Sequence, residues 1–144
     1  MVRKIKGFTL IELIIVVAII AILLAIAIPP LNKWRIRYYI ESDTKAIYGL
    51  LQEGRMKAFT NKKDLIVTIT GKQVCLKEGN TNIKCIKLKN YFSGTVNITK
   101  RGIFNNSHIK YSGSANVNPS YDCVVTTYTR AKLGEWDGSD CKAK

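Results

Sequence analysis

The N-terminal part of the chain contains an apolar run that constrains everything after it. Residues 8–28 form one stretch in which Glu12 is the only charged residue. A run of this length is enough to cross a bilayer as an α-helix. Arg3, Lys4 and Lys6 precede it, which predicts that the N-terminus stays in the cytoplasm. The rest of the chain then lies on the other side of the membrane.

Glu12 is the residue of this run that needs an explanation. A carboxylate inside a membrane segment is costly and is usually retained for a partner. It is unfavourable in a secretory signal peptide, although Ala25-Ile26-Ala27 offers a cleavage site of the A-x-A type. A matching positive charge would be the α-amino group created by a cut between Gly7 and Phe8. The alternative is a local salt bridge, or a side chain that reaches the lipid headgroups.

The residues around Glu12 resemble a known processing signal. The stretch Lys6-Gly7-Phe8-Thr9-Leu10-Ile11-Glu12-Leu13 is similar to the class III signal of type IV pilins and of the pseudopilins of type II secretion. This resemblance implies cleavage between Gly7 and Phe8 by a prepilin peptidase and N-methylation of Phe8. It also implies that Glu12 pairs with the Phe8 amine of a neighbouring subunit during assembly.

The resemblance also implies a location and a set of partners. The chain would cross the inner membrane once, with its N-terminus in the cytoplasm and its C-terminal domain in the periplasm or outside the cell. It would then enter a pilus or pseudopilus. The expected partners are the prepilin peptidase, other pilin or pseudopilin subunits and the inner membrane.

The resemblance and the apolar pattern together divide the chain into four segments. The resemblance implies a leader peptide at 1–7 and a transmembrane and assembly helix at 8–30, and the pattern after it predicts an amphipathic continuation at 31–62 and a globular β domain at 63–144. Pro29 and Pro30 disturb the helix, because each lacks an N–H donor and its ring clashes with the preceding turn. After them, apolar residues recur at helical spacing and predict a face packed on the domain: Ile36, Ile40, Ile47, Leu51, Gly54 and Ala58.

From Asp64 the apolar period changes to two, which predicts short antiparallel strands. We expect strands at 65–70, 73–77, 83–89, 95–99, 108–112, 122–129 and 132–136, and a loop at 113–120. The expected fold class is α+β, with a long N-terminal transmembrane α-helix packed on a small antiparallel β-sheet domain. This is the architecture of type IV pilins, which the resemblance also implies.

The four cysteines predict disulfides. An even number of cysteines after an N-terminal apolar segment indicates an oxidising compartment. Three pairings are open; Cys75–Cys85 and Cys123–Cys141 are favoured because each closes a short local loop. There is no C-x-x-C pair and His108 is the only histidine, so we expect no metal site. No catalytic or cofactor motif is present, and we expect no cofactor and no enzymatic activity.

The charge of the chain is strongly positive. The formal net charge is +13, with 23 Lys and Arg against 10 Asp and Glu. Only three of these cations and one acid, Glu12, precede residue 31, so the remainder carries +11. An excess of this size indicates a polyanionic partner or an anionic surface, or else a lysine-rich solvated face.

Three later stretches resemble the FimT/GspH-type minor pilins: residues 55–61, 98–104 and 124–134. The main interpretation is therefore a minor pilin or a type II secretion pseudopilin.

In some FimT-type pilins a Gly-Arg-x-Arg element near the C-terminus binds DNA during natural transformation. The matching residues here are Arg130 and Lys132, with Thr129 in place of the glycine. One alternative is thus a DNA-binding minor pilin, in which Arg130 and Lys132 contact DNA, rather than forming a solvated hairpin edge. A second alternative is a major structural pilin.

Overall fold

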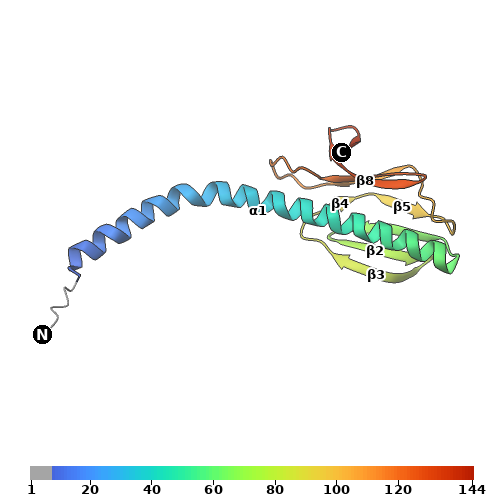
Figure 1. The fold of residues 1–144 in the computed structure, drawn as a ribbon, viewed down its shortest axis with the longest axis horizontal. Helices are drawn as coiled ribbons and strands as arrows, with labels where there is room; N and C mark the ends of the chain where they lie inside the picture. Colours follow the sequence, from blue (N-terminus) through green and yellow to red (C-terminus); the bar gives the residue numbers. More distant parts are fainter. Residues whose placement is uncertain (1–7) are drawn as a thin grey trace, which may run out of the picture. The chain divides into compact units, whose positions relative to one another are not determined.

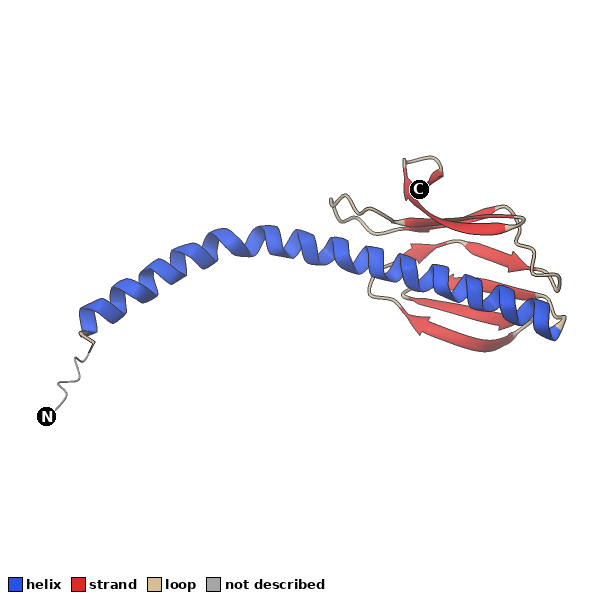
Figure 2. Cartoon of the chain, in the orientation of Figure 1, coloured by secondary structure: helices blue, strands red, loops and turns tan. Residues whose placement is uncertain are grey.

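The computed structural model describes residues 8–144, except for the side chains of residues 27–29. Its first element is helix α1 (Leu10–Asn61), which has 52 residues. The chain divides into two units, one ending at Arg35 and a compact one spanning Ile36–Lys144. Figure 1 labels the elements, and Figure 2 separates helix from strand.

The helical residues before Arg35 are almost uniformly apolar and exposed. Leu10, Ile11 and Leu13 are all more than half exposed, and the other large apolar residues of the helix up to Ile26 are 44% to 71% exposed. Among the described residues, no single helix is long and apolar enough to cross a membrane by itself. A bent pair, Leu10–Ile26 with Pro30–Asn61, satisfies that requirement jointly, by length and composition.

The compact unit adds nine strands to the second half of α1. They are β1 (Leu65–Thr70), β2 (Gln73–Glu78), β3 (Thr81–Lys87), β4 (Phe92–Ser93), β5 (Thr95–Ile98), β6 (Ser107–Tyr111), β7 (Cys123–Thr127), β8 (Arg130–Trp136) and β9 (Cys141–Ala143). The seven expected strands are all present, with boundaries that differ by a few residues. β4 and β9 were not expected, because two or three residues are too few for a period of two to be recognised.

The strands form two antiparallel sheets where we expected one. One sheet has the order β3-β2-β1-β5 and the other β4-β6-β7-β8-β9. An isolated bridge between Ile98 and Phe104 links the end of β5 to the connection that leads into β6. The change of sheet between β4 and β5 occurs at Gly94, which has a φ of 135°, a backbone conformation that favours glycine.

Helix α1 and the inner faces of both sheets form one core. The helix contributes Ile40, Ile47, Leu50, Leu51 and Ala58, each at most 1% exposed. Gly54 permits close approach, because a Cβ there would lie 2.8 Å from Leu76 Cδ1. The predicted apolar face is thus confirmed except at Ile36, which is 38% exposed and lies at the first position of the unit. Figure 1 shows the helix lying over β2, with β3 beside it.

The helix ends where the sequence predicts. Lys62 follows the last helical residue and adopts a left-handed conformation, with a φ of 57°. The Lys63 N–H then donates to the Ala58 carbonyl at 3.3 Å, which closes the final turn. The fold class is α+β, a long N-terminal helix packed on antiparallel sheets, as expected from the sequence.

Candidate functional site

The start of helix α1 has the local structure that its sequence requires. Thr9 is the residue before the first helical position, and its hydroxyl oxygen accepts the Glu12 N–H at 3.3 Å. The Thr9 carbonyl also accepts the Leu13 N–H at 3.2 Å. Thr-x-x-Glu is the spacing of a capping box, in which the glutamate carboxylate would return to the threonine N–H. Only the threonine half of that arrangement forms here.

The Glu12 carboxylate consequently has no partner among residues 8–144. It lies in the first turn of α1, where the helix dipole favours a negative charge. Phe8, four residues earlier, is 79% exposed. Gly7, the predicted cleavage residue, lies outside the described residues. The carboxylate is thus available to a positive group on another molecule.

The residues around the prolines continue the helix. α1 includes Pro29 and Pro30, and a bend separates Leu10–Ile26 from the helical part that begins at Pro30. A bend at this position is what the two missing N–H donors and the proline rings would cause.

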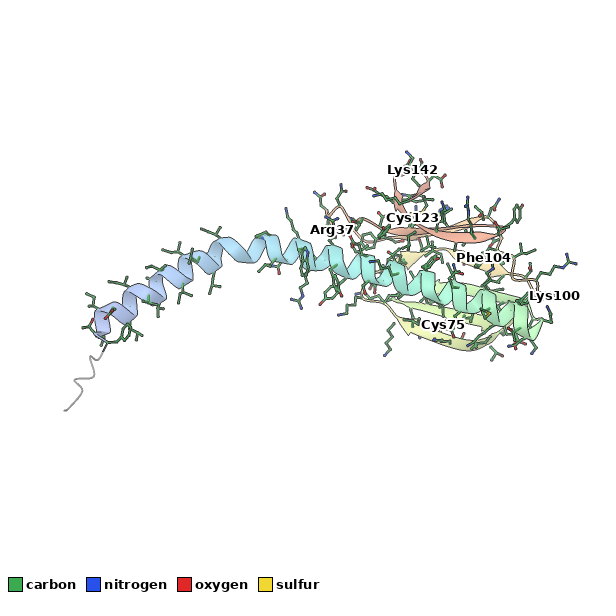
Figure 3. The ribbon with its side chains drawn as sticks, in the orientation of Figure 1. Arg37, Cys75, Lys100, Phe104, Cys123 and Lys142 are labelled. Carbon is green, nitrogen blue, oxygen red and sulfur yellow. A yellow bond between two sulfur atoms is a disulfide. The ribbon has the colours of Figure 1, made fainter. Side chains whose placement is uncertain are left out.

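The cysteines form two disulfides, Cys75–Cys85 and Cys123–Cys141. These are the pairings that the sequence favoured. Cys75 and Cys85 face each other directly across β2 and β3. Cys123 and Cys141 lie on β7 and β9, the two strands that flank β8. The second disulfide therefore ties the C-terminal strand across its neighbour, and Figure 3 labels Cys75 and Cys123.

Arg130 and Lys132 project from the solvent side of β8, while Ala131 between them is buried. Lys132 pairs in register with Val125, which pairs with His108 on β6. Lys110, two residues after His108, lies 4.0 Å from the centroid of the Trp136 ring. We call this surface the basic sheet face: His108, Lys110, Arg130, Lys132 and Trp136.

The structure joins residues here that the sequence could not connect. Trp136, at the end of β8, packs against His108, with ring centroids 4.9 Å apart. Arg130 and Lys132 lie in the part of β8 that pairs with β7 alone, since the pairing of β8 with β9 begins at Gly134. Their exposure therefore fits both interpretations, a solvated hairpin edge and a binding surface.

Much of the remaining positive charge already has a partner. Six cations of the compact unit form ion pairs: Arg37, Lys57, Lys63, Lys84, Lys142 and Lys144. Six lie over aromatic rings: Lys45, Arg55, Lys62, Lys72, Lys89 and Lys110. The described residues contain no group of three His, Cys, Asp or Glu side chains that would hold a metal ion.

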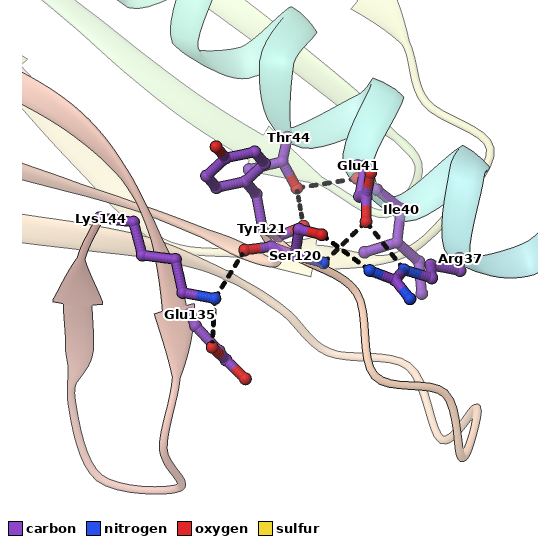
Figure 4. Close-up of polar contacts among 8 residues, drawn as sticks. All are labelled: Arg37, Ile40, Glu41, Thr44, Ser120, Tyr121, Glu135 and Lys144. Carbon is purple, nitrogen blue, oxygen red and sulfur yellow. Dashed lines mark hydrogen bonds and ion pairs between the residues drawn. The ribbon is translucent and has the colours of Figure 1, made fainter.

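A polar cluster that the sequence did not indicate fixes the start of the compact unit (Figure 4). Glu41 Oε1 accepts the Ser120 N–H at 2.7 Å and Arg37 Nε at 3.1 Å. The Thr44 hydroxyl donates to the Ile40 carbonyl at 2.8 Å, within the helix. Lys144 Nζ pairs with Glu135 at 2.6 Å beside Ser120. The bond between Ser120 and Glu41 links α1 to the loop before β7, and the helical pattern alone carried no signal of it.

The same bonds perturb the Glu41 carboxyl. Partial burial raises its pKa, but the Ser120 N–H and Arg37 outweigh burial and hold it below its usual value. The pKa of the Asp122 carboxyl shifts in the opposite direction. Burial raises it, although the carboxylate accepts a hydrogen bond from the Trp136 N–H.

Comparison with known proteins gives two findings. Residues 2–28 match the family described as the prokaryotic N-terminal methylation motif. The chain is also 40% identical over 78 residues to the type IV major fimbrial protein FimA of Dichelobacter nodosus strain VCS1703A, and equally to a second FimA from Dichelobacter nodosus. No solved structure matches.

The extent of these matches limits what they mean. The alignment covers 54% of this chain and 46% of the relative, so the chain spans about half the length of the curated relatives it matches. The N-terminal segment carries the prepilin methylation motif, and the similarity is to a type IV fimbrial protein. The relatives are named major fimbrial proteins, which favours the major-pilin alternative over the minor-pilin interpretation.

Proposed function

We propose that this chain is a structural subunit of a type IV pilus, made as a prepilin and assembled from the inner membrane. The prepilin peptidase would cut between Gly7 and Phe8, and Phe8 would be N-methylated. The apolar part of α1 would hold the subunit in the membrane until it packs against the same part of other subunits. An enzymatic activity has no support, since the curated relatives are named fimbrial proteins.

The observation that carries this proposal is the exposed apolar helix with one unpartnered carboxylate. A folded chain rarely leaves so many large apolar side chains uncovered unless lipid or another protein covers them. The methylation motif over residues 2–28 adds a reason for Phe8 to become the mature N-terminus. Its amine and the Glu12 carboxylate would then be opposite charges at similar depth, where a low dielectric strengthens their attraction.

The names of the relatives indicate whether the chain is a major or a minor subunit. We infer a major subunit, because the proteins it resembles are named major fimbrial proteins. The sheared filament fraction of cells that express the chain should then contain it as an abundant component. A minor pilin or pseudopilin would be present there in a few copies only.

The test is to express the full chain together with a prepilin peptidase and a pilus assembly machinery. Mass spectrometry should find a mature N-terminus at methylated Phe8. The isosteric variant Glu12→Gln should be cleaved as the wild type is, yet be lost from sheared filaments. Glu78→Gln, which removes an exposed carboxylate from β2, is the matched control and should assemble.

Two results would contradict the proposal. A mature chain that begins at Ile28 would identify a secreted protein cut at the A-x-A site. Filaments that incorporate Glu12→Gln as well as the wild type would show that Glu12 has no part in assembly.

A second proposal concerns DNA and rests on the basic sheet face. Lys110 lies over the Trp136 ring, and Arg130 and Lys132 are exposed farther along β8. The face therefore has cations that can neutralise phosphates and a ring that can stack on a base. The full chain in neutral detergent should then bind duplex DNA, and the logarithm of the binding constant should fall linearly with the logarithm of the salt concentration. Arg130→Glu/Lys132→Glu should abolish the binding, whereas Lys87→Glu, at an exposed position of β3, should not. Binding only at low salt, unchanged in the double variant, would exclude this role.

A further inference from the structure

A groove beside the C-terminal turns of α1 is separate from both surfaces described so far. It has a volume of about 390 Å³ and is lined by Gln52, Arg55, Met56, Phe59, Arg101 and Gly102. We call it the tip groove. Met56 and Phe59 are 68% and 55% exposed, although they belong to the compact unit. Large apolar side chains left in water beside a groove indicate a contact surface.

A tight turn builds one wall of the tip groove. Gly102 donates its N–H to the Thr99 carbonyl at 2.7 Å and has a φ of 74°, which L-residues rarely adopt. A Cβ at Gly102 would lie 3.4 Å from Arg55 Cγ, so the turn is in contact with the helix. The turn thereby places Arg101 next to α1.

The charge of the tip groove is uncompensated. Arg55 donates to the Thr129 carbonyl at 2.7 Å, which is a neutral acceptor. Lys62 Nζ lies 3.9 Å from the centroid of the Phe59 ring. In the described part of the chain, Arg55, Lys62 and Arg101 form no ion pair. The groove therefore fits a partner that brings carboxylates.

Most carboxylates of the compact unit are already engaged with another segment. Glu53 and Glu78 pair with lysines, and Asp43 and Asp64 accept backbone N–H groups. The exception lies in the segment Glu135-Trp136-Asp137-Gly138-Ser139-Asp140. Glu135 pairs with Lys144 and Asp137 with Lys142, whereas the Asp140 carboxylate accepts, within the described part of the chain, only the N–H of its neighbour Cys141. Asp140 is exposed and forms no ion pair with any described residue.

The acidic segment and the tip groove lie apart on the same unit. Thr129, bound by Arg55, immediately precedes β8, whereas Asp137–Asp140 follows it. Seven residues of strand separate the two by about 20 Å. Figure 3 shows the separation through Lys100, in the turn that builds the groove, and Lys142, just after the acidic loop.

We propose that the acidic loop, residues 137–140, of one subunit docks on the tip groove of a second copy of this chain, with Asp140 opposite Arg101. This inference rests on the proposed function, because it needs a filament of identical subunits. Two different, complementary patches on one subunit make a heterologous contact, and repeated heterologous contacts build open filaments. Met56 and Phe59 would be covered at the same time.

The test uses filaments of the full chain and a carbodiimide, which joins an amine to a carboxylate without a spacer. Cross-linked dimers, separated on a denaturing gel and digested, should contain Lys62 or Lys100 joined to Asp137 or Asp140. Arg101→Glu and Asp140→Lys should each lower filament yield about fivefold, the effect of an exposed ion pair at the upper end of its usual range. The double variant Arg101→Glu/Asp140→Lys should recover most of the yield, and Lys87→Glu should leave it unchanged.

The outcomes separate this inference from the function on which it rests. A chain that never enters filaments would overturn both. Filaments that form normally but give cross-links elsewhere, for example from Lys110 or Lys132 of the basic sheet face, would overturn the docking inference alone. Failure of the double variant to recover, while each single variant is folded by circular dichroism, would do the same.

Discussion

Asp43 binds Asn90 through two hydrogen bonds, since its Oδ2 accepts both the backbone N–H and the side-chain Nδ2 of Asn90 at 2.9 Å. The same oxygen accepts the Lys89 N–H at 3.0 Å. Asp43 is 7% exposed, so these bonds form away from water. One carboxylate of α1 therefore fixes residues 89 and 90 of the connection between β3 and β4.

Replacing Asp43 should be strongly destabilising. Asp43→Ala leaves donors on residues 89 and 90 without an acceptor, and we expect the free energy of unfolding to fall by about 3 kcal/mol. Asp43→Asn keeps one acceptor oxygen and should lose about half of that. Denaturant unfolding of the oxidised full chain in neutral detergent measures both. Glu78→Ala, which removes an exposed pair, should change the value by less than about 1 kcal/mol.

The Glu41 cluster predicts a dependence of stability on pH. Its pKa lies below the usual value of 4.5, because the Ser120 and Arg37 hydrogen bonds outweigh the opposing effect of burial. A lowered folded-state pKa contributes stability that is present above the unfolded pKa and is lost as pH falls through the folded one. The melting temperature of Glu41→Gln should therefore fall less than that of the wild type as pH is lowered from about 6 to below 4.5, through the folded-state pKa.

Comparing the wild type with Glu41→Gln separates the contribution of Glu41 to the pH dependence from the contributions of the other carboxyls. Glu53 and Asp137 also have lowered pKa values and lose stabilisation in the same direction. Asp122 has a raised pKa, and its protonation relieves a burial cost as pH falls. These contributions are common to wild type and variant, so parallel melting curves for the two chains would contradict the role assigned to Glu41.

The helix and most strands could be predicted because their signals are local. The change of apolar period at Asp64 and the helix end near Asn61 depend on neighbouring residues only. The disulfides were favoured on the same ground, as each closes a short loop. Glu12 was noticed because a lone carboxylate in an apolar run is unusual within a short window.

The rest depended on contacts between distant segments. Asp43 and Asn90 are 47 residues apart, and Arg55 and Thr129 are 74 apart, so no periodicity connects them. The division into two sheets follows from which strands pair, and β1 pairs with the distant β5 as well as with its hairpin partner β2. The tip groove likewise needs the turn at Gly102 to meet the helix.

A substitution at Gly134 tests whether the Cys123–Cys141 disulfide requires a glycine beside it. It lies on β8, between the strands that carry Cys123 and Cys141. A Cβ there would lie 2.5 Å from the Lys142 carbonyl oxygen and 2.8 Å from Cys141 Sγ. Neither the backbone carbonyl nor the cross-linked sulfur can move away from an added Cβ without a large energetic cost. Gly134→Ala should therefore destabilise the oxidised chain by about 2 kcal/mol.

Gly49→Ala is the matched control, because nothing lies within 4 Å of a Cβ at that exposed helical position. It should stabilise the chain by up to about 1 kcal/mol, the difference in helix propensity. Reduction of Cys123–Cys141 frees the sulfur near Gly134, so the penalty of Gly134→Ala should shrink in the reduced chain while the gain at Gly49 persists. Denaturant unfolding with and without a reductant measures all four values. An equal penalty in both redox states would mean that the Lys142 carbonyl alone excludes a side chain from Gly134, and that the disulfide does not require glycine there.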